Sequence, residues 1–482
     1  MSFRSSDRSR RRCRSDAAGK RASDRCRSAT CSSASPRAGT FEHWSAEGQR
    51  PRLAYCGRLK AATFVYNQPL AQGSMETDYR GEDNCGAPNM QPLTWFRSLI
   101  KTNAKKKEKA NNKKNKRQRE HSGKTLTFSI TQNANSVGIH GDSLSLQFAV
   151  EGIDLPQNVD ASFSVWSILP AAMAAGFNVH IEHPIDPVVA ANAEQLTRIW
   201  EMWIPNRYRS VTVSGEGEWS RNRKQRFPRV DLYSGGVDST YSILQSASLK
   251  HRGYALTVRG LDYRDKNASA KRFPELISKT APLLKKINYQ QTVVRTDARF
   301  DPLSITHGFT LASCLFLLSD LFEEGTIAAD QTLVQDMVTF PWGNNHLTNH
   351  YLAGSDFAMR TVGADLTRTE KLAVIAGSGV ALPFLSFCRK PSIVPSNCGR
   401  CDKCVRTKVM LAAAIGRVPE IFIDSQFNKD FVKRLETGGR GRADVFEIYH
   451  YALQHGHIDA VPGLLELVEE CRQIETPDPR EL

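Results

Sequence analysis

The chain has 482 residues, and its 65 Lys and Arg against 50 Asp and Glu give a formal net charge of +15. At about 150 residues per domain, this length predicts two or three domains. A hydrophobic content of 40% is enough for a core and excludes a fully disordered or fibrous chain. No apolar run approaches the roughly 18 residues of a membrane-spanning helix, and the start lacks the apolar stretch of a signal peptide. We therefore expect a cytoplasmic protein.

The positive charge is confined to the first quarter of the chain. Residues 1–124 contain 28 basic and 11 acidic residues, whereas the remainder contains 37 and 39. The Ser- and Arg-rich residues 1–40 have few large apolar side chains, which predicts disorder. Their composition also leaves a transit peptide open. We expect residues 1–123 to form a disordered basic segment, or to lie partly upstream of a true start at Met75 or Met90.

A polybasic stretch closes this segment, with ten basic residues between positions 101 and 120. It suits an arm for RNA, DNA or anionic lipid, or a solvated linker. No aromatic residue is interleaved to stack on bases, so nucleic-acid binding is not favoured.

Ordered structure is expected from Lys124 onward, beginning with a small α+β module over residues 124–226. Apolar and polar residues alternate in its first segments, as they do in half-buried strands. The expected strands are 124–130, 143–150, 179–182 and 210–217, and the expected amphipathic helices are 163–176 and 188–204.

From Arg229 the pattern changes to alternating strands and helices, which predicts a parallel α/β sheet. The expected strands are 229–234, 255–261 and 291–297, and the expected helices are 237–249, 274–287 and 307–322. After Cys404 the chain is expected to be all-helical, with helices at 405–416, 444–454 and 463–472.

The most informative string is SGGVDS at 234–239, where a predicted strand ends and a helix begins. Two glycines permit a tight turn whose N–H groups can approach an anion, and the helix N-terminus adds partial positive charge. Hydroxyl donors come from Ser234, Ser239 and Thr240. Because Asp238 would repel a phosphate by itself, we interpret it as a ligand of a bridging Mg²⁺. The string lacks the lysine of a Walker loop and is not GxGxxG.

This string resembles the pyrophosphate-binding loop of the PP-loop, or N-type, ATP pyrophosphatases. The resemblance implies a doubly wound, adenine nucleotide α-hydrolase-like sheet with ATP at the carboxyl ends of its strands. It implies adenylation of a carbonyl oxygen and release of pyrophosphate, with Asp238 and Ser239 as catalytic residues. The implied nucleotide-binding positions are Ser234, Gly235, Gly236, Val237, Asp238, Ser239, Thr240 and Val258.

Four cysteines lie within 17 residues, in the pattern C-x9-C-x2-C-x2-C. They are Cys388, Cys398, Cys401 and Cys404. Four thiolates at this spacing predict a closed, structural Zn²⁺ site, and an iron–sulfur cluster has similar ligand chemistry. Arg400, Lys403 and Arg406 would partly offset the thiolate charge. We divide the ordered part into an ATP-binding domain at 227–387 and a zinc-bound helical part at 388–482.

The segments LTRTEKLAVIA, LSFCRKPS and NCGRCDKCVRT resemble the C-terminal part of 7-cyano-7-deazaguanine synthase, and ALTVRGLDYR resembles its second strand. The resemblance covers roughly 229–416 and implies a diverged homologue. Two substrate-facing regions depart from that enzyme. Thr306-His307-Gly308 replaces an Arg-Asn motif, and FPWGNNHLTNH at 340–350 replaces a segment rich in Asp, Tyr and Pro.

Several weaker signals remain open. His346 and His350 have the spacing of HExxH but lack its Glu, and they could line an acceptor pocket. Arg368 and Lys371 would contact nucleotide phosphates or be solvated helix charges. GGRGR at 438–442 favours a flexible loop. A surface metal site is not favoured at the remaining histidine group, which is His450, His455 and His457.

Together these features predict an ATP-dependent ligase that adenylates a carboxylate, such as 7-carboxy-7-deazaguanine or a related modified base, before ammonia or an amine attacks. The expected cofactors are ATP, Mg²⁺ and Zn²⁺. Expected partners are proteins of the same locus, as in queuosine biosynthesis or anti-phage defence, and a second copy in a homodimer. The alternatives are a tRNA thiolase with an iron–sulfur cluster and a non-catalytic nucleotide-binding component of a bacterial defence system.

Overall fold

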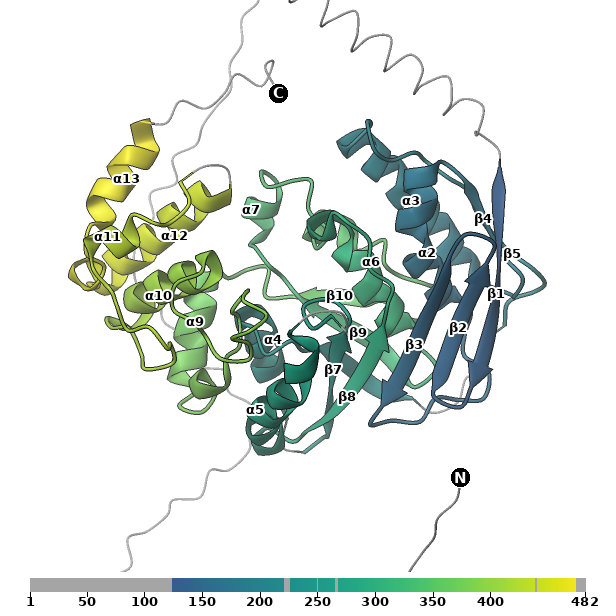
Figure 1. Ribbon diagram of the computed structural model, residues 1–482, viewed down its shortest axis with the longest axis horizontal. Coiled ribbons are helices and arrows are strands. Elements are labelled where there is room, and N and C mark those ends of the chain that lie inside the picture. Colours follow the sequence, from purple (N-terminus) through teal and green to yellow (C-terminus); the bar gives the residue numbers. More distant parts are fainter. Residues whose placement is uncertain (1–123, 221–225, 249, 265–267, 438–439, 474–482) are drawn as a thin grey trace, which may run out of the picture. The chain divides into compact units, whose positions relative to one another are not determined.

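The computed structural model describes residues 124–220, 226–248, 250–264, 268–437 and 440–473 (Figure 1). All of them belong to one compact unit, Met90–Leu482. The basic segment predicted at 1–123 lies outside the described residues, as does part of the loop predicted at 438–442. No helix in the described part is both long and apolar enough to cross a membrane.

The first described region combines an antiparallel meander with a short parallel extension. Strands β1 to β3 pair in antiparallel order, β4 pairs in parallel with β1, and β5 pairs in parallel with β4. The elements are β1 (Thr125–Asn133), β2 (Ser136–Gly141), β3 (Ser145–Glu151), α2 (Ser162–Ala175), β4 (Asn178–Ile181), α3 (Pro187–Trp203) and β5 (Val213–Gly215). The α+β module predicted from the sequence is therefore present, with β2 as an additional strand.

The second region is a five-stranded parallel sheet in the order β8-β7-β6-β9-β10. Its elements are β6 (Phe227–Leu232), α4 (Val237–Ser246), β7 (Gly253–Arg259), α5 (Phe273–Lys286), β8 (Tyr289–Thr296), α6 (Leu303–Phe316), β9 (Phe322–Ala328) and β10 (Met359–Val362). The strand order reverses between β6 and β9. We call this junction the switch point. Ligands of such sheets bind outside it, at the carboxyl ends of the strands.

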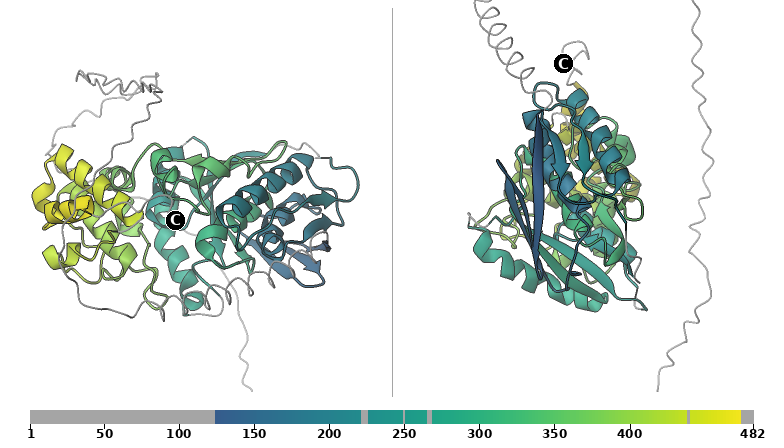
Figure 2. Two further views of the ribbon diagram at one scale, coloured as in Figure 1. Left: turned by 90° about the horizontal axis from the view of Figure 1, so that it is seen from above. Right: turned by 90° about the vertical axis from the view of Figure 1, so that its right-hand side faces the viewer.

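The two regions share one sheet of ten strands, in the order β10-β9-β6-β7-β8-β3-β2-β1-β4-β5. Strand β3 joins them, because it pairs in antiparallel order with β8 from Phe148 opposite Thr296 to Glu151 opposite Val293. The boundary predicted near residue 226 therefore does not separate two sheets. Figure 2 shows the first strands in dark blue continuing the sheet on the side away from the yellow C-terminal helices.

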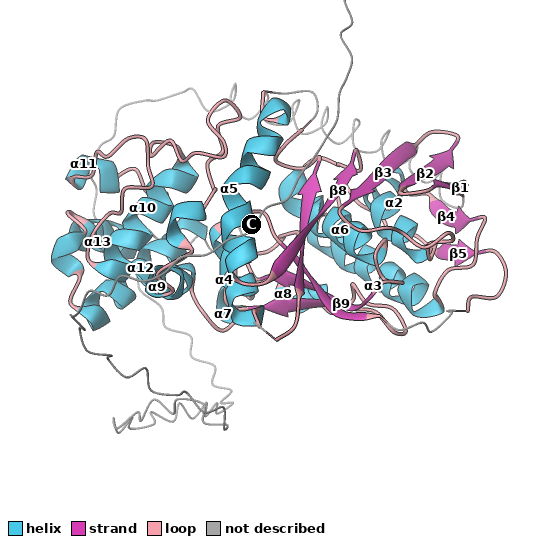
Figure 3. Ribbon diagram, turned by 90° about the horizontal axis from the view of Figure 1, so that it is seen from below, coloured by secondary structure: helices cyan, strands magenta, loops and turns pink. Residues whose placement is uncertain are grey.

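Helices cover both faces of the parallel strands, as right-handed crossovers on either side of a switch point require. Figure 3 shows α4 and α5 on one side of the strands, and α6 with α2 and α3 on the other. Each side has its own hydrophobic cluster. One unites α2, α3 and α6 with the first strands, and the other unites α4 and α5 with the C-terminal helices.

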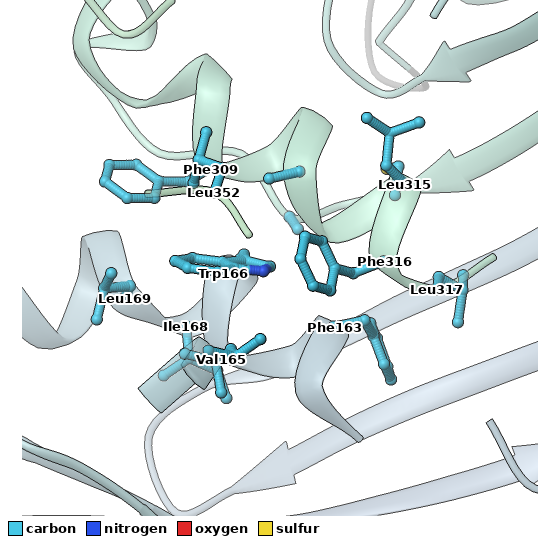
Figure 4. Packing of buried hydrophobic residues seen from close by; sticks show 14 of the residues in the cluster. Phe163, Val165, Trp166, Ile168, Leu169, Phe309, Leu315, Phe316, Leu317 and Leu352 are labelled. Atoms are coloured by element: carbon cyan, nitrogen blue, oxygen red, sulfur yellow. The ribbon is translucent and has the colours of Figure 1, made fainter. Parts of the chain in front are cut away.

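Helix α2 is buried along almost its whole length, so the prediction of an amphipathic helix was wrong. It packs against α6, where the rings of Trp166 and Phe316 lie 5.6 Å apart in an edge-on arrangement (Figure 4). The hydroxyl of Ser313 on α6 donates to the carbonyl of Phe163 on α2 at 2.9 Å. Apolar residues thus lie on all sides of α2, because the helix packs inside the core.

The predicted helix at 307–322 spans two elements. Helix α6 ends at Phe316, and β9 begins at Phe322 after a turn. The apolar residues that follow Phe316 extended the predicted helix to Phe322, and β9, which has Glu323 and Glu324 after its first residue, was not predicted. Helix α4 likewise ends at Ser246 instead of near residue 249, and β10 was not predicted.

The C-terminal part is helical, as predicted. Two short helices lie between β9 and β10, and the remaining helices follow β10. They are α7 (Leu333–Asp336), α8 (His346–Asn349), α9 (Arg368–Gly377), α10 (Asp402–Ile415), α11 (Lys429–Val432), α12 (Arg440–His455) and α13 (Leu464–Gln473), with 3-10 turns at Leu382–Phe384 and Ile458–Ala460. A further 3-10 turn, Ala270–Arg272, comes before α5.

Candidate active site and metal centre

Residues 234–239 form a glycine turn between β6 and α4, as the sequence predicted. Gly235 has φ of 75°, a left-handed conformation that favours glycine, and Gly236 caps α4. A side chain at Gly235 would also press on Thr280 and Leu276, with a Cβ only 3.2 and 3.3 Å from their nearest atoms. The turn is therefore fixed by its backbone.

Two hydroxyls line the glycine turn. The Oγ atoms of Ser234 and Ser239 lie 3.2 Å apart, and the amides of Ser234 and Gly236 donate to Ser239 Oγ and Ser234 Oγ, respectively. Ser234 is exposed, whereas the side chains of Val237, Ser239 and Thr240 are buried. The first amides of α4 have no acceptor within the helix, so the turn presents N–H groups and the Ser234 hydroxyl at the switch point, with the Ser239 hydroxyl beside it.

Val258, the remaining predicted nucleotide position, lies on the neighbouring strand. It is the second-last residue of β7 and pairs in register with Val294 of β8. It is half-buried. The structure thus places all eight predicted nucleotide positions on the glycine turn, the first turn of α4, or the carboxyl end of β7.

Asp238 is paired with two cations from α9. Arg368 contacts both carboxylate oxygens, with Nε 3.2 Å from Oδ1 and Nη2 2.5 Å from Oδ2. Lys371 Nζ lies 3.5 Å from Oδ1 and donates to the carbonyl of Ala329 at 2.7 Å. Lys371 is fully buried and Arg368 is 9% exposed, so the alternative of solvated helix charges was wrong. Burial opposes the charge of Arg368, but Asp238 and then Asp330 raise the pKa of the guanidinium overall.

The start of α9 is fixed by two carboxylates, which explains how its cations reach Asp238. Thr367 and Glu370 form a capping box at the first turn. Glu447 of α12 accepts from the amide and the hydroxyl of Thr369 at 3.1 and 3.0 Å. Burial, and next the neighbouring Asp444, raise the pKa of Glu447.

A second group of side chains meets on the other side of the switch point. Asp330, two residues beyond β9, accepts from the indole N–H of Trp342 at 2.8 Å and, through its carbonyl, from Arg368 at 3.3 Å. His307, in the first turns of α6, has its Nε2 atom 4.0 Å from Asp330 Oδ2. Sequence reasoning missed Asp330, because β9, the strand that places it, was not predicted.

The first region supports this side of the switch point. The indole of Trp200 on α3 donates to the carbonyl of Ile305 at the start of α6, at 3.3 Å. Trp203 stacks on Phe340, with centroids 5.9 Å apart. Asp186 accepts from the amide of Ser355 at 2.5 Å and from its hydroxyl at 2.7 Å. The module at 124–226 therefore contacts both segments at which the sequence departs from the synthase that it resembles.

The predicted histidine pair does not form a metal site. His350 is exposed with its ring against Tyr351, at 4.1 Å between centroids. His346 is half-buried at the start of α8. Within the described ranges, only the four cysteines form a group able to hold a metal ion.

The four predicted cysteine ligands do converge, and all their sulfur atoms lie within 4.8 Å of one another. We call them the cysteine cluster. Cys388 and Cys401 Sγ are 3.9 Å apart, and Cys398 and Cys404 Sγ are 3.8 Å apart. Four sulfurs at about 2.3 Å from one zinc ion would be about 3.8 Å apart, so the cluster fits a tetrahedral zinc site.

Main-chain N–H groups and one buried cation support the cysteine cluster. The amides of Arg400 and Cys401 both lie 3.3 Å from Cys398 Sγ. Lys408 is completely buried and donates to the carbonyls of Asp424 and Gln426 at 2.6 and 3.1 Å. This lysine was not predicted, although its position on the face of α10 that carries Cys404 is a signal for it.

The cations predicted to balance the thiolates have other partners. Arg400 pairs with Asp424, and Arg406 donates to Asp444 at 2.9 Å. Lys403 is exposed on the first turn of α10. Asp424, and to a smaller extent Cys398, raise the pKa of the Arg400 guanidinium.

The cysteine cluster is linked to the glycine turn through a short peptide segment. The amide of Ser386, two residues before Cys388, donates to the carbonyl of Gly235 at 2.7 Å. Asn397, next to Cys398, accepts from the amide of Phe387 at 3.1 Å. Metal ligands and the glycine turn are therefore parts of one hydrogen-bonded structure.

Comparisons of the chain with protein-family models, with curated proteins and with solved structures find no match. The site is therefore interpreted from its own geometry and from the sequence motifs.

Proposed function

We propose that this protein is an ATP-dependent carbon–nitrogen ligase that activates a carboxylate as an acyl adenylate and releases pyrophosphate. The observation that carries the proposal is the SGGVDS turn at the switch point, with Asp238 set against two buried cations. The resemblance of this string and of the C-terminal motifs to 7-cyano-7-deazaguanine synthase supports 7-carboxy-7-deazaguanine or a related modified base as the acid.

The residues of the switch point have separable roles in this reaction. The amides of the glycine turn and the hydroxyls of Ser234 and Ser239 would bind the β- and γ-phosphates of ATP. Lys371 and Arg368 would balance the negative charge that collects on pyrophosphate as it leaves. Positioning and charge neutralisation supply most of the catalysis in such transfers, so a side-chain nucleophile is not needed.

Mg²⁺ would be held by Asp238, whose carboxylate is the kind of oxygen ligand this ion takes in nucleotide sites. Mg²⁺ held there would offset the negative charge of the phosphates. Because Asp238 is already paired with Arg368, the carboxylate must share or exchange this partner when the nucleotide enters.

Zinc at the cysteine cluster would have a structural role, because four thiolates leave no open position for a substrate. The sulfur spacing also favours one ion over an iron–sulfur cluster, which distributes its cysteines over several iron atoms. A colourless protein with one zinc per chain by elemental analysis supports this choice. Broad visible absorbance from bound iron would instead support the thiolase alternative.

The activity can be tested by a pyrophosphate-release screen over carboxylic acids, including 7-carboxy-7-deazaguanine, with ammonium as the nitrogen donor. Release of pyrophosphate and AMP with at least one acid supports the proposal, and Asp238→Asn should abolish it. ATP binding without pyrophosphate release for every acid would favour the non-catalytic alternative.

A further inference from the structure

His307 stands at the switch point in a fixed tautomer. Its Nδ1 atom lies 2.9 Å from the carbonyl of Leu303, one turn earlier on α6. A carbonyl oxygen can only accept, so Nδ1 carries the hydrogen. The lone pair of the neutral imidazole is then on Nε2, the atom that faces Asp330.

Nε2 and the Asp330 carboxylate together form a pair of acceptors. The 4.0 Å between Nε2 and Oδ2 is too long for a hydrogen bond. Two acceptors at this separation can, however, both accept from one nitrogen that carries several hydrogens, since the nitrogen can lie about 2.9 Å from each acceptor atom. The side chains of His307 and Asp330 are 17% and 24% exposed, so a small donor can reach both.

Trp342 and Arg368 hold Asp330 in place beside His307. Trp342 donates its indole N–H to Oδ2, and Arg368 of α9 donates to the Asp330 carbonyl while its Nη2 lies 3.9 Å from Oδ1. Arg368 also pairs with Asp238 of α4. The acceptor pair is therefore connected to the glycine turn through a single guanidinium.

We propose that His307 Nε2 is the proton acceptor for the nitrogen nucleophile, and that Asp330 Oδ2 positions this nitrogen beside it. The proposal rests on the proposed function and assigns an ammonium ion or a primary amine to this position. The protonated nitrogen first gives one proton to Nε2, which passes it to solvent, and the neutral nitrogen then attacks the acyl carbon. As the new C–N bond forms, the C–O bond to AMP breaks, and the second proton lost by the nitrogen leaves by the same route, so atoms and charge balance.

The test compares His307→Gln with the wild type in the full chain, with ATP, Mg²⁺ and 7-carboxy-7-deazaguanine. ATP–pyrophosphate exchange measures adenylation, and amide formation measures nitrogen attack. We expect exchange to stay within about twofold, while the rate with ammonium falls by about 100-fold or more, the range for loss of a general base.

Hydroxylamine supplies the discriminating nucleophile, because it is largely unprotonated at neutral pH and needs little help from a base. We expect His307→Gln to slow hydroxamate formation by less than about tenfold, well below its effect with ammonium. Asp330→Asn should raise the KM for ammonium while kcat with hydroxylamine stays near that of the wild type. These patterns would not arise from a merely structural role.

His455→Gln is a matched control, since the ring of His455 makes the same contact to a carbonyl one turn earlier, at 2.9 Å, and is exposed at the end of α12. It should leave both nucleophiles unaffected. Equal losses with ammonium and hydroxylamine in His307→Gln would overturn the role of His307 alone. Absence of exchange in the wild type with every acid would overturn the proposed function and this role with it.

Discussion

The cysteine cluster and the switch point both gather charged groups, but they balance the charges differently. At the switch point, Asp238 and Asp330 face Arg368 and Lys371, so opposite charges neutralise one another without a ligand. The cysteine cluster brings together four thiols that become anions when they bind a metal, and only the metal neutralises them. The switch point can therefore keep its structure without a bound ligand, whereas the cysteine cluster needs its metal ion.

Metal removal should therefore have the largest effect. Chelation at neutral pH should lower the free energy of unfolding by on the order of 5 kcal/mol or more, because zinc binding contributes directly to folding. Urea denaturation with and without chelator measures this loss. The Cys401→Ser variant should lose the metal, and Cys314→Ala, a buried thiol outside the cysteine cluster, should keep it. Equal stability of the metal-free and metal-bound protein would contradict the comparison.

Removing one charge from the switch point should lower stability less than metal removal does, but it should abolish activity. Asp238→Asn leaves two buried cations without their carboxylate, which should destabilise the fold by about 3 kcal/mol. The chain should still fold, and pyrophosphate release should fall to background. Thermal unfolding and product analysis are the two measurements. Asp142→Asn, which changes an exposed carboxylate, should alter neither. Unchanged stability in Asp238→Asn would show that the cations are balanced by other groups.

Loss of the hydrogen bond that links the cysteine cluster to the glycine turn should have an intermediate effect. Ser386→Pro removes the amide that donates to Gly235 and should weaken ATP binding by about tenfold, since an unsatisfied buried acceptor costs roughly 1–3 kcal/mol. Ser386→Ala keeps this amide and should bind ATP nearly as the wild type does. Calorimetric titration of the metal-loaded variants measures the difference. Similar affinities for the two variants would show that the glycine turn does not need this link.

A pH dependence should be the smallest effect. Because the pKa of Glu447 is raised above its ordinary value of 4.5, the folded state binds this proton more tightly than the unfolded chain. Its contribution to stability is present at low pH and is lost as the pH rises through the folded pKa. The stability of Glu447→Gln relative to the wild type should therefore improve on going from pH 4 to pH 7, measured by urea denaturation.

Glu466 provides the opposite case for this measurement. Its hydrogen bond with Lys429 lowers its pKa, so its contribution is present at neutral pH and is lost as the pH falls. Glu466→Gln should improve relative to the wild type as the pH falls. The same direction for both variants would contradict the assignment.

The cysteine cluster and the switch point also differ in how far the sequence predicts them. The cysteine cluster lies within 17 residues, and the glycine turn within six, so spacing and local propensity indicate both. Asp238 and Arg368 are 130 positions apart, and their pairing depends on α12 holding the start of α9. No local pattern contains that information.

The fold shows the same limit. The strand and helix alternation after Arg229 predicts a parallel sheet, and the strand order agrees with a doubly wound arrangement. The pairing of β3 with β8, which makes one sheet of two predicted domains, depends on edges that the sequence does not mark. Asp330 was missed because β9 (FEEGTIA), the strand that places it, lacks the alternation of a half-buried strand and was not predicted.

The identity of the products of ATP cleavage tests the central claim most directly. With Mg²⁺, ammonium and an accepted carboxylic acid, the protein should convert ATP to AMP and pyrophosphate, as the SGGVDS turn beside Lys371 and Arg368 predicts. Chromatography of the nucleotides from one reaction resolves the question. Formation of ADP and inorganic phosphate would contradict the account, because it places the attack on the γ-phosphate instead of the α-phosphate.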